Sequence, residues 1–432
     1  MHQFRYVGNK LFCEGVAVAA LAEKFGTPFY VYSQQTLTDH FQKLDAALAP
    51  LDHLVCFAMK ANSNLSVMRT LANLGSGFDV VSAGELQRVI AAGGDPRKCV
   101  FAGVAKTESE IEFALRQGIY SFNCESEPEI ARINQVAARL KKIAPIAVRV
   151  NPNIEAHTHA KITTGTYENK FGIAFENIEG VYARASRLKN IKLRGLQMHI
   201  GSQLTSVSPY ELAVKKVLPL VRKLAERHGL EFFSPGGGLG IIYNPALASG
   251  AADWWQSPAA KGILTPASYA EKLLPLLQPL GLKILIEPGR FIVGNAGILV
   301  TRVEYVKRTG KKNFVIVDAA MNDLIRPAFY DSYHEIVPLV KKSGATVASD
   351  VVGGICESGD YFCKDRPLAK VGAGDRLALL SAGAYGFVMA SNYNTRPLAA
   401  EVLVSGKKFA VARERQSIAE IWAGEKVVSW LK

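Results

Sequence analysis

Short apolar runs alternate with longer segments of helical periodicity over the first two thirds of the chain. Each run has the length and the β-branched or aromatic content of a buried strand. The eight runs are Leu54–Met59, Phe78–Val81, Cys99–Ala102, Ile119–Asn123, Ile146–Asn151, Leu193–Ile200, Glu231–Ser234 and Leu282–Ile286. Between them lie segments with helical spacing that are long enough for parallel crossovers, such as Ala83–Ala92, Ser126–Lys142 and Ser208–His228. The pattern predicts an α/β fold with a (β/α)₈ TIM-like barrel, opened by a helix at about 36–49.

The pattern changes after Arg290, where β-rich runs are separated by Gly, Pro and Lys turns. The runs are Gly297–Thr309, Asn313–Ala319, His334–Leu339, Thr346–Ile355 and Arg376–Leu380. They predict a second, mainly antiparallel β domain, which the strand-like stretch Phe4–Phe12 is expected to join. We therefore expect the barrel over residues 28–290 and the β domain over residues 1–27 and 291–432.

The stretch Ile241–Pro266 departs from this rhythm, because it is rich in Gly, Ala and Pro and carries adjacent Trp254 and Trp255. A loop of this length is more often functional or interface-forming than idle. We expect it to pack near the mouth of an active site or at a surface between subunits.

Composition indicates an ordinary globular protein with more than one core. The chain has 432 residues, of which 49% are hydrophobic and 21% charged. Its net charge of +13 comes from 51 basic and 38 acidic residues, but the basic pairs are scattered and form no stripe interleaved with aromatics. The charge therefore does not predict a nucleic-acid partner, although it suits small anionic ligands.

The cysteines and the N-terminus bear on the compartment. Six cysteines show no CxxC spacing, and several lie in apolar runs where a reduced cysteine acts as a small hydrophobic side chain. Val16–Ala22 resembles the start of an amphipathic helix rather than a signal peptide, and no apolar stretch reaches the roughly 18 residues of a spanning helix. These signs predict a reducing, cytoplasmic setting and no membrane partner.

Chemically active residues follow the carboxyl ends of the predicted barrel strands, which is where barrel enzymes build their active sites. In strand order they are Lys60, Asp79 and Ser82, His199 and Ser202, Gly236-Gly237-Gly238, and Glu287-Pro288-Gly289-Arg290.

Three of these features together indicate pyridoxal phosphate. The amides of Gly236–Gly238 can approach a phosphate closely, and Ser202 and Arg290 can add donors to it. Lys60 alone would usually be a solvated charge, but beside a phosphate cradle it is a candidate Schiff-base nucleophile. Glu287 is then a candidate partner for the pyridine nitrogen. The alternatives are a flexible glycine turn and a structural salt bridge between Glu287 and Arg290.

Histidines supply two further candidates. His199 stands where an imidazole can stack on a cofactor ring, although a lone strand histidine is often a hydrogen-bonded core residue. His157 and His159 superficially suggest metal ligands, but no Cys, Asp or Glu stands nearby at ligand spacing. We therefore expect no metal site.

A second cluster lies in the predicted β domain. Cys356 and Glu357 stand at a turn beyond an apolar strand, and a glycine-framed turn exposes Tyr385. Arg326, followed by Tyr330, offers a guanidinium for a substrate carboxylate. A protonated Cys356 thiol suits a proton donor. The alternatives are a buried, inert cysteine and an exposed surface arginine.

Nine segments stand in a characteristic order along nearly the whole chain: FAMKAN (57–62), FDVVSAGEL (78–86), NKFGI (169–173), HIGSQ (199–203), GGGLGI (236–241), EPGR (287–290), MNDLIRPAFY (321–330), CESGD (356–360) and GAYG (383–386). In this order and spacing they resemble the fold-type III pyridoxal-phosphate decarboxylases, and among these the diaminopimelate decarboxylases. Gly354, where a proline is expected, the stretch Ala160-Lys161-Ile162 and the long Trp254-Trp255 segment depart from the family pattern. These departures concern loop geometry rather than the reaction.

The resemblance implies a barrel that carries pyridoxal 5'-phosphate and an obligate homodimer whose active sites are completed across the interface. Its implied catalytic residues are Lys60, which binds the cofactor covalently, His199, Glu287 and Cys356. The implied cofactor-binding residues are Lys60, Asp79, His199, Ser202, Gly236, Gly237, Gly238, Glu287, Pro288, Gly289, Arg290 and Tyr385. The implied substrate-binding residues are Arg290, Arg326, Tyr330, Glu357 and Tyr385, and Cys356 and Glu357 are expected to reach in from the partner subunit.

The far end of the substrate can be argued from two of these residues. Ornithine or lysine presents only an ammonium there, whereas Arg326 together with Glu357 suits an end that bears a carboxylate and an ammonium. This favours decarboxylation of meso-2,6-diaminopimelate to L-lysine and CO₂, the last step of lysine biosynthesis. The alternatives are a decarboxylase of ornithine, lysine, arginine or a carboxylated polyamine, an amino-acid racemase on a similar barrel, and a protein that holds the cofactor without turnover.

Overall fold

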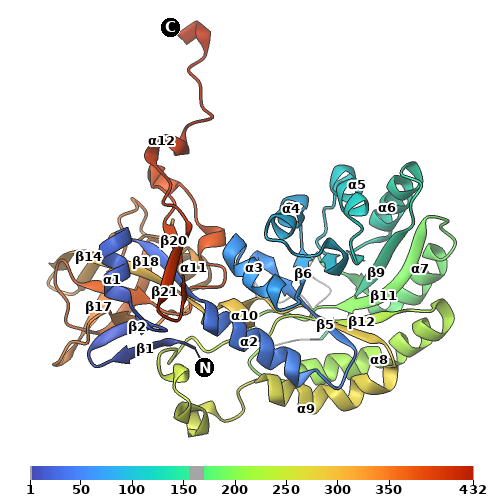
Figure 1. Ribbon diagram of the computed structural model, residues 1–432, viewed down its shortest axis with the longest axis horizontal. Helices are drawn as coiled ribbons and strands as arrows, with labels where there is room; N and C mark the ends of the chain where they lie inside the picture. The colour runs from blue at the N-terminus through green and yellow to red at the C-terminus, as the bar shows by residue number, and fades with distance from the viewer. Residues whose placement is uncertain (1, 155–169, 432) are drawn as a thin grey trace. The chain divides into compact units, whose positions relative to one another are not determined.

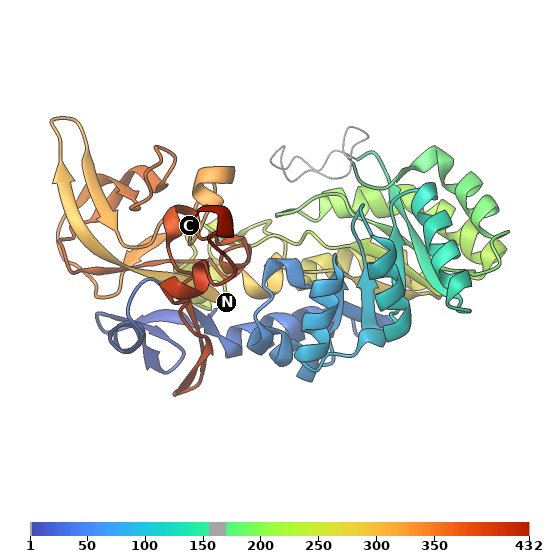
Figure 2. The same ribbon diagram turned by 90° about the horizontal axis from the view of Figure 1, so that it is seen from above.

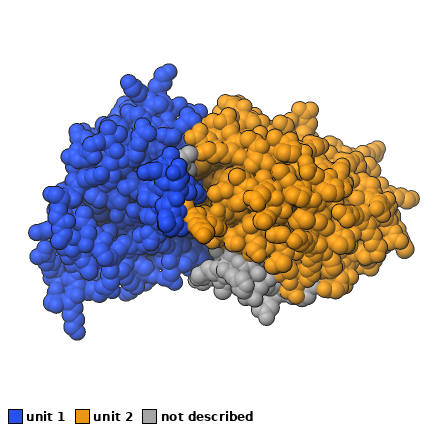
Figure 3. Space-filling model, turned by 90° about the horizontal axis from the view of Figure 1, so that it is seen from below, with its two compact units in different colours: residues 1–36, 242–259, 293–432 blue, residues 37–241, 260–292 orange. Residues whose placement is uncertain are grey.

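The computed structural model describes residues 2–154 and 170–431. The chain divides into two compact units, which Figure 3 colours separately. One contains residues 37–241 and 260–292, and the other contains residues 1–36, 242–259 and 293–432.

Eight parallel strands form the closed barrel of the first unit (Figures 1 and 2). They are β5 (His53–Ala58), β6 (Gly77–Val80), β7 (Cys99–Phe101), β8 (Ser121–Cys124), β9 (Ala144–Asn151), β11 (Ile191–Met198), β12 (Phe232–Gly236) and β13 (Lys283–Ile286). Each pairs with the next, and β13 pairs with β5 to close the ring. A two-residue strand, β10 (Ile173–Ala174), adds to the end of β9. The eight predicted runs are therefore strands, and the predicted barrel is confirmed.

Several barrel helices begin where the sequence supplies a capping hydroxyl. Ser82, Thr107, Ser126 and Thr265 each accept a hydrogen bond from the backbone N–H three residues later. These caps open α4 (Ala83–Ala91), α5 (Glu108–Gln117), α6 (Glu127–Arg139) and α9 (Pro266–Leu277). The other helices in or entering this unit are α2 (Gln34–Ala47), which is the predicted opening helix, α3 (Leu65–Asn73), α7 (Ile178–Ala185), α8 (Ser208–His228) and α10 (Arg290–Val293).

Apolar side chains from separate strands fill the barrel interior. Cys56, Val100, Ala147, Phe232 and Leu285 form one buried cluster. The Phe232 ring fits because a glycine stands opposite, since a Cβ at position 195 would lie 2.5 Å from that ring. The barrel is thus a packed core, and its polar side chains collect where the strands end.

The second unit is built on a mainly antiparallel sheet. Its strand order is β18 (Tyr361–Ala369), β17 (Thr346–Val352), β15 (Asn313–Val317), β14 (Gly297–Arg308), β4 (Phe29–Ser33), β20 (Ala400–Ser405) and β21 (Lys408–Arg413), and β19 (Arg376–Leu379) links β14 to β16 (Ile336–Pro338). The pairs β15–β17 and β4–β20 are parallel. The N-terminal strands β1 (Phe4–Val7), β2 (Lys10–Cys13) and β3 (Val16–Ala17) and helix α1 (Val18–Phe25) share its apolar core.

The unit boundaries differ from the predicted limits of 28–290 for the barrel. β4 pairs with β14 and β20, so residues 28–36 belong to the second unit. All five side chains of its sequence FYVYS are buried. A run that is apolar on both faces is equally compatible with a barrel strand, and only its long-range pairing decides the matter.

Residues 242–259, part of the predicted loop, also belong to the second unit. The His2 imidazole lies 2.5 Å from the Ala246 carbonyl oxygen, and the Leu247 N–H donates to the Glu335 carboxylate at 2.7 Å. The ring of Trp255 donates to a backbone carbonyl at 3.0 Å. The bonds from His2 and to Glu335 attach the segment to the rest of the β unit, whereas the Trp255 bond to Ser249 lies within the segment. Its place near an active-site mouth or at a subunit surface stays a prediction.

Two short helices, α11 (Arg326–Tyr330) and α12 (Ile418–Ile421), complete this unit. Over residues 2–154 and 170–431, no helix has both the length and the apolar character that crossing a membrane requires.

Candidate active site

Lys60 lies on a 3₁₀ turn, Met59–Ala61, that directly follows β5. Two asparagines shape the chain beyond it. The Asn62 side chain accepts a hydrogen bond from the Asn64 N–H at 3.0 Å, and the Asn64 side chain caps α3 through the Ser66 N–H at 2.9 Å. The strand end predicted from sequence therefore places the Lys60 amine at the carboxyl end of the barrel, with 41% of its side chain exposed.

The amine contacts an acid on the next strand. Nζ of Lys60 lies 2.5 Å from Oδ2 of Asp79, whose side chain is only 2% exposed. The other oxygen of Asp79, Oδ1, has no hydrogen-bond partner within the described part of the chain. Because buried polar atoms are almost always bonded, this oxygen fits a site that a polar ligand completes.

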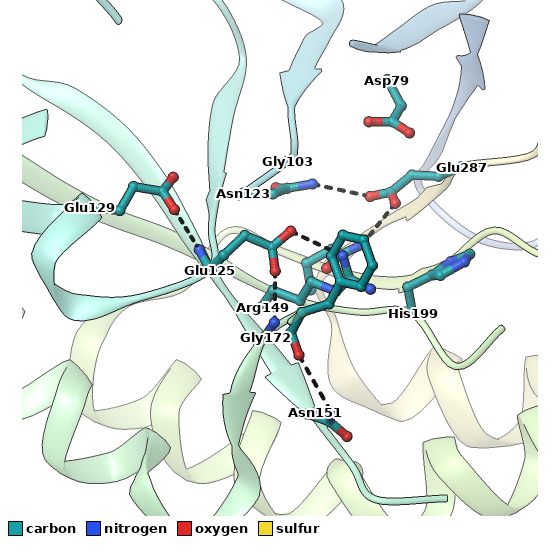
Figure 4. A network of polar contacts seen from close by, with 12 residues as sticks. Asp79, Gly103, Asn123, Glu125, Glu129, Arg149, Asn151, Gly172, His199 and Glu287 are labelled. Carbon is teal, nitrogen blue, oxygen red and sulfur yellow. Dashed lines mark hydrogen bonds and ion pairs between the residues drawn. The ribbon is translucent and has the colours of Figure 1, made fainter. Parts of the chain in front are cut away.

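Glu287 directly follows β13 as a buried carboxylate held by three neutral donors, of which Figure 4 labels Asn123. Ser234 and Asn123 donate to Oε1 at 2.9 and 3.3 Å, and Gln197 donates to Oε2 at 2.8 Å. Burial, and then the nearby charge of Asp79, raise the pKa of Glu287 to about 7, against the lowering effect of its hydrogen bonds and of Lys60. The residue is therefore able to take up or release a proton near neutral pH.

The three residues that donate hydrogen bonds to Glu287 were not predicted from the sequence. Asn123, Gln197 and Ser234 stand near the ends of β8, β11 and β12, inside the runs predicted as strands. The signal that could have found them is the one that found Lys60, namely a polar side chain where a barrel strand ends.

His199 follows β11 and is partly buried. Its Nδ1 accepts a hydrogen bond from the Gly237 N–H at 3.3 Å. Desolvation, and then the charges of Arg149 and Lys60, lower the pKa of His199 well below its usual value. The imidazole is therefore neutral, with the acceptor nitrogen turned to the glycine loop.

The glycine loop is packed backbone against backbone. A Cβ on Gly237 would lie 1.9 Å from the Glu287 carbonyl oxygen. A Cβ on Gly236 would lie 2.2 Å from the Met198 carbonyl oxygen, and one on Gly238 would lie 2.1 Å from the Gly201 carbonyl oxygen. Gly236 and Gly238 also have φ values of 83° and 98°, which favour glycine. Tyr210 on α8 donates to the Gly237 carbonyl at 2.9 Å. The loop is therefore fixed rather than flexible, as a phosphate cradle requires.

The Glu287-Pro288-Gly289-Arg290 segment lies against the end of β5. The Ala58 N–H donates to the Pro288 carbonyl at 2.9 Å, and a Cβ on Gly289 would lie 3.1 Å from Ala58 and Ala61 atoms. Arg290 begins α10 and donates to the Ser202 hydroxyl at 3.2 Å. The structure thus brings Ser202 and Arg290 together as predicted from sequence.

A buried ion pair at the ends of β8 and β9 was also missed (Figure 4). Arg149 donates to Glu125 at 3.0 Å, and the other oxygen of Glu125 accepts from the Gly172 N–H at 2.7 Å. The guanidinium lies 4.7 Å from the centre of the Phe171 ring. These contacts fix the described part of the NKFGI segment, residues 170–173, at this end of the barrel.

The described residues contain no group of three or more His, Cys, Asp or Glu side chains able to hold a metal ion. His157 and His159, like Asn169 and the Ala160–Ile162 stretch, lie outside the described residues.

Five predicted site residues lie in the second unit. Arg326 and Tyr330 are on α11, and Tyr385 follows β19 with a φ of 56° in the glycine-framed turn. Arg326 is 5% exposed, so the alternative of a surface arginine is wrong.

Cys356 and Glu357 lie on an exposed turn after β17. All six cysteines lie in the described part of the chain. Five of them are buried, and Cys356 is exposed. Two side chains hold the turn: Asp360 accepts a hydrogen bond from the Ile355 N–H at 2.7 Å, and Asn394 accepts one from the Cys356 N–H at 3.0 Å. The thiol is therefore held on a defined backbone at the surface of its unit, which excludes the alternative of a buried cysteine.

Comparison with known proteins agrees with this geometry. Residues 34–294 match the family of pyridoxal-dependent decarboxylases over its pyridoxal binding domain. The chain belongs to this family. Its cofactor is pyridoxal phosphate, and the buried acid, the glycine cradle and the strand-end lysine fit that group, although the role of each residue stays a prediction.

The chain resembles family members over its full length. It is 47% identical over 431 residues to diaminopimelate decarboxylase of Vibrio cholerae serotype O1, covering 99% of this chain and all of the relative. It is 50% identical over 416 residues to diaminopimelate decarboxylase of Neisseria meningitidis serogroup B, covering 96% and 97%. The crystal structure of diaminopimelate decarboxylase from M. jannaschii in co-complex with L-lysine superposes with a TM-score of 0.91 at 36% identity, covering 100% and 99%.

Gly237→Ala should weaken the binding of pyridoxal phosphate at least about tenfold, because an added Cβ forces the cradle away from the end of β13. Fluorescence titration of the cofactor-free protein measures the affinity. Gly310→Ala is the control, since a Cβ there meets no atom within 4 Å. Equal affinity in both variants would contradict the cradle.

In the cofactor-free protein, Glu287 should make folding less favourable as the pH rises from 4.5 to about 7. Its pKa is higher in the folded state, so the bound proton stabilises folding fully below pH 4.5, and this contribution is lost as the pH rises through the folded pKa of about 7. Glu287→Gln cannot titrate. Urea unfolding at several pH values should show the wild type losing stability relative to this variant across that window, and a constant difference would refute the assignment.

Proposed function

We propose that this pyridoxal-phosphate enzyme decarboxylates meso-2,6-diaminopimelate to L-lysine and CO₂. The observation that supports this substrate most strongly is the full-length identity of 47% and 50% to two proteins named diaminopimelate decarboxylase. A buried arginine in the β unit, suited to a substrate carboxylate, agrees with it.

In this proposal the barrel side chains hold the cofactor. Lys60 binds it covalently, the amides of Gly236–Gly238 with Ser202 and Arg290 hold its phosphate, and His199 lies against its ring. When bound, pyridoxal phosphate supplies an electron sink for the electron pair of the bond that breaks at the substrate α-carbon.

Glu287 has the central electrostatic role. Its pKa of about 7 keeps a proton available at the carboxylate, where the pyridine nitrogen is expected. Its three neutral donors orient the carboxylate oxygens without cancelling their negative charge. The carboxylate can therefore share a proton with the ligand, since no protein cation pairs with it directly. Asp79 orients the Lys60 amine from the neighbouring strand.

The β unit is proposed to complete the reaction. The bond between the α-carbon and the carboxylate breaks, and the carboxylate leaves as CO₂ without the bonding electron pair. That pair then forms the new C–H bond with one proton from Sγ of Cys356, which is left as a thiolate. Arg326 binds the carboxylate at the far end of the substrate, and Glu357 its ammonium, with Tyr330 and Tyr385 beside them.

Two further proposals concern the assembly and its setting. We place Cys356 and Glu357 in the active site of the partner subunit of a homodimer, as the family resemblance implies. A reducing, cytoplasmic setting is supported by the six cysteines, all of which are free.

The purified enzyme with pyridoxal phosphate should release labelled CO₂ from meso-diaminopimelate and not from ornithine, lysine or arginine. Lys60→Ala should release none, because it lacks the amine that binds the cofactor. Scintillation counting measures the product. Release from a basic amino acid instead would retain the reaction and overturn the substrate, and racemisation without CO₂ release would overturn the reaction.

Shared active sites predict complementation between two inactive variants. Lys60→Ala and Cys356→Ala, co-expressed with different tags, should form mixed dimers with one intact site, giving about a quarter of wild-type activity if subunits assort at random. Each variant expressed alone is the control. Mixed dimers no more active than the two parents would place Cys356 in the site of its own subunit, and full activity of Cys356→Ala would remove it from the mechanism.

A further inference from the structure

The Arg326 guanidinium is held by a histidine eight residues further along the chain. Nη1 of Arg326 lies 2.9 Å from Nε2 of His334, and Nη2 donates to the Ser332 hydroxyl at 3.2 Å. The chain turns back because α11 ends at Tyr330 and is followed by Asp331, whose φ of 52° is left-handed. This turn returns Ser332 and His334 to the arginine at the start of the helix.

The hydrogen bonds of His334 determine its tautomer. Its Nδ1 lies 2.8 Å from the Leu380 carbonyl oxygen, which can only accept, so Nδ1 carries the hydrogen. A guanidinium can only donate, so Nε2 offers its lone pair to Arg326. His334 is fully buried and therefore presents a neutral ring of fixed orientation to the arginine.

An aromatic ring from the distant segment 242–259 completes this cluster. The Tyr243 and His334 rings meet edge to face, with centroids 5.4 Å apart, and the Arg326 guanidinium carbon lies 4.9 Å from the Tyr243 ring centre. The imidazole, the hydroxyl and the ring are all neutral, so these three contacts orient the guanidinium without cancelling its charge. An orienting contact of this kind suits an arginine that binds a carboxylate ligand.

We propose that His334 is a positioning residue for Arg326 and thereby sets the preference for ligands that carry a carboxylate at the non-reacting end. The inference rests on the proposed function, in which Arg326 binds that carboxylate. Neither the nine segments of the family resemblance nor the predicted site residues include His334. Its role is to select the ligand and not to take part in bond breaking.

The test compares two ligands that differ only in that carboxylate. L-lysine, the product of the proposed reaction, keeps it, and 1,5-diaminopentane lacks it. In His334→Asn the shorter amide can still reach the Leu380 carbonyl but not Arg326, whereas the Gln of His334→Gln reaches the position of Nε2 and can accept from Arg326.

His334→Asn should raise the KM for meso-diaminopimelate and the inhibition constant of L-lysine roughly ten- to hundredfold, as expected for a lost hydrogen bond to a charged group. The inhibition constant of 1,5-diaminopentane and kcat should change less than about threefold. His334→Gln should recover most of the selectivity. Arg326→Ala is the reference for complete loss of this selectivity. His40→Leu is the control, because it removes another buried imidazole that is bonded to a backbone carbonyl. It should leave the ratio of the two inhibition constants unchanged.

Cofactor content and thermal unfolding report whether each variant folds. His334→Phe, which keeps the ring volume and loses both hydrogen bonds, replaces His334→Asn if that variant does not fold, and should show the same shift. Equal changes for both inhibitors, or none, in an active protein would overturn the inference and leave the proposed function standing. Absence of CO₂ release from meso-diaminopimelate by the wild type would overturn both.

Discussion

The buried carboxylate of Glu287 is the constraint on which the barrel site depends. Its oxygens are satisfied by side chains from β8, β11 and β12, while the residue itself directly follows β13. Four strands must therefore close in one register before this charge can be buried at tolerable cost. The same closure brings the glycine loop against the Glu287 backbone, where no side chain larger than hydrogen fits at position 237. The acid and the cradle are thus two consequences of one packing arrangement.

Much of the barrel could be predicted from sequence because its strands are short apolar runs separated by helices of regular spacing. The rule that strand ends carry the chemistry then located Lys60, His199, the glycines and Glu287. It failed for Asn123, Gln197 and Ser234, because a polar residue inside a predicted strand gives no sign of whether it faces the barrel interior or a helix. Only the closed ring shows that all three converge on Glu287.

The β unit was harder to predict, since its order depends on pairings between distant segments. β4 lies more than 260 residues before its partner β14, and nothing in FYVYS distinguishes a barrel strand from a sheet strand. β18, β20 and β21 were not predicted at all. The contact between Arg326 and His334 could not be predicted from the sequence either. It requires a left-handed backbone conformation at Asp331, which helical periodicity does not reveal.

Three carboxylates at the carboxyl end of the barrel differ in the charge of the groups that contact them, and this difference indicates the role of each. Asp79 contacts the Lys60 amine, and Glu125 contacts the Arg149 guanidinium. Glu287 instead receives hydrogen bonds from two amides and a hydroxyl, and burial raises its pKa to about 7. A carboxylate already paired with a cation gains little by sharing a proton with a ligand, whereas one held by neutral donors gains a partner for its charge. Within the described site, Glu287 is therefore the acid best suited to face a basic ring nitrogen, while Asp79 and Glu125 serve to orient the cations they bind.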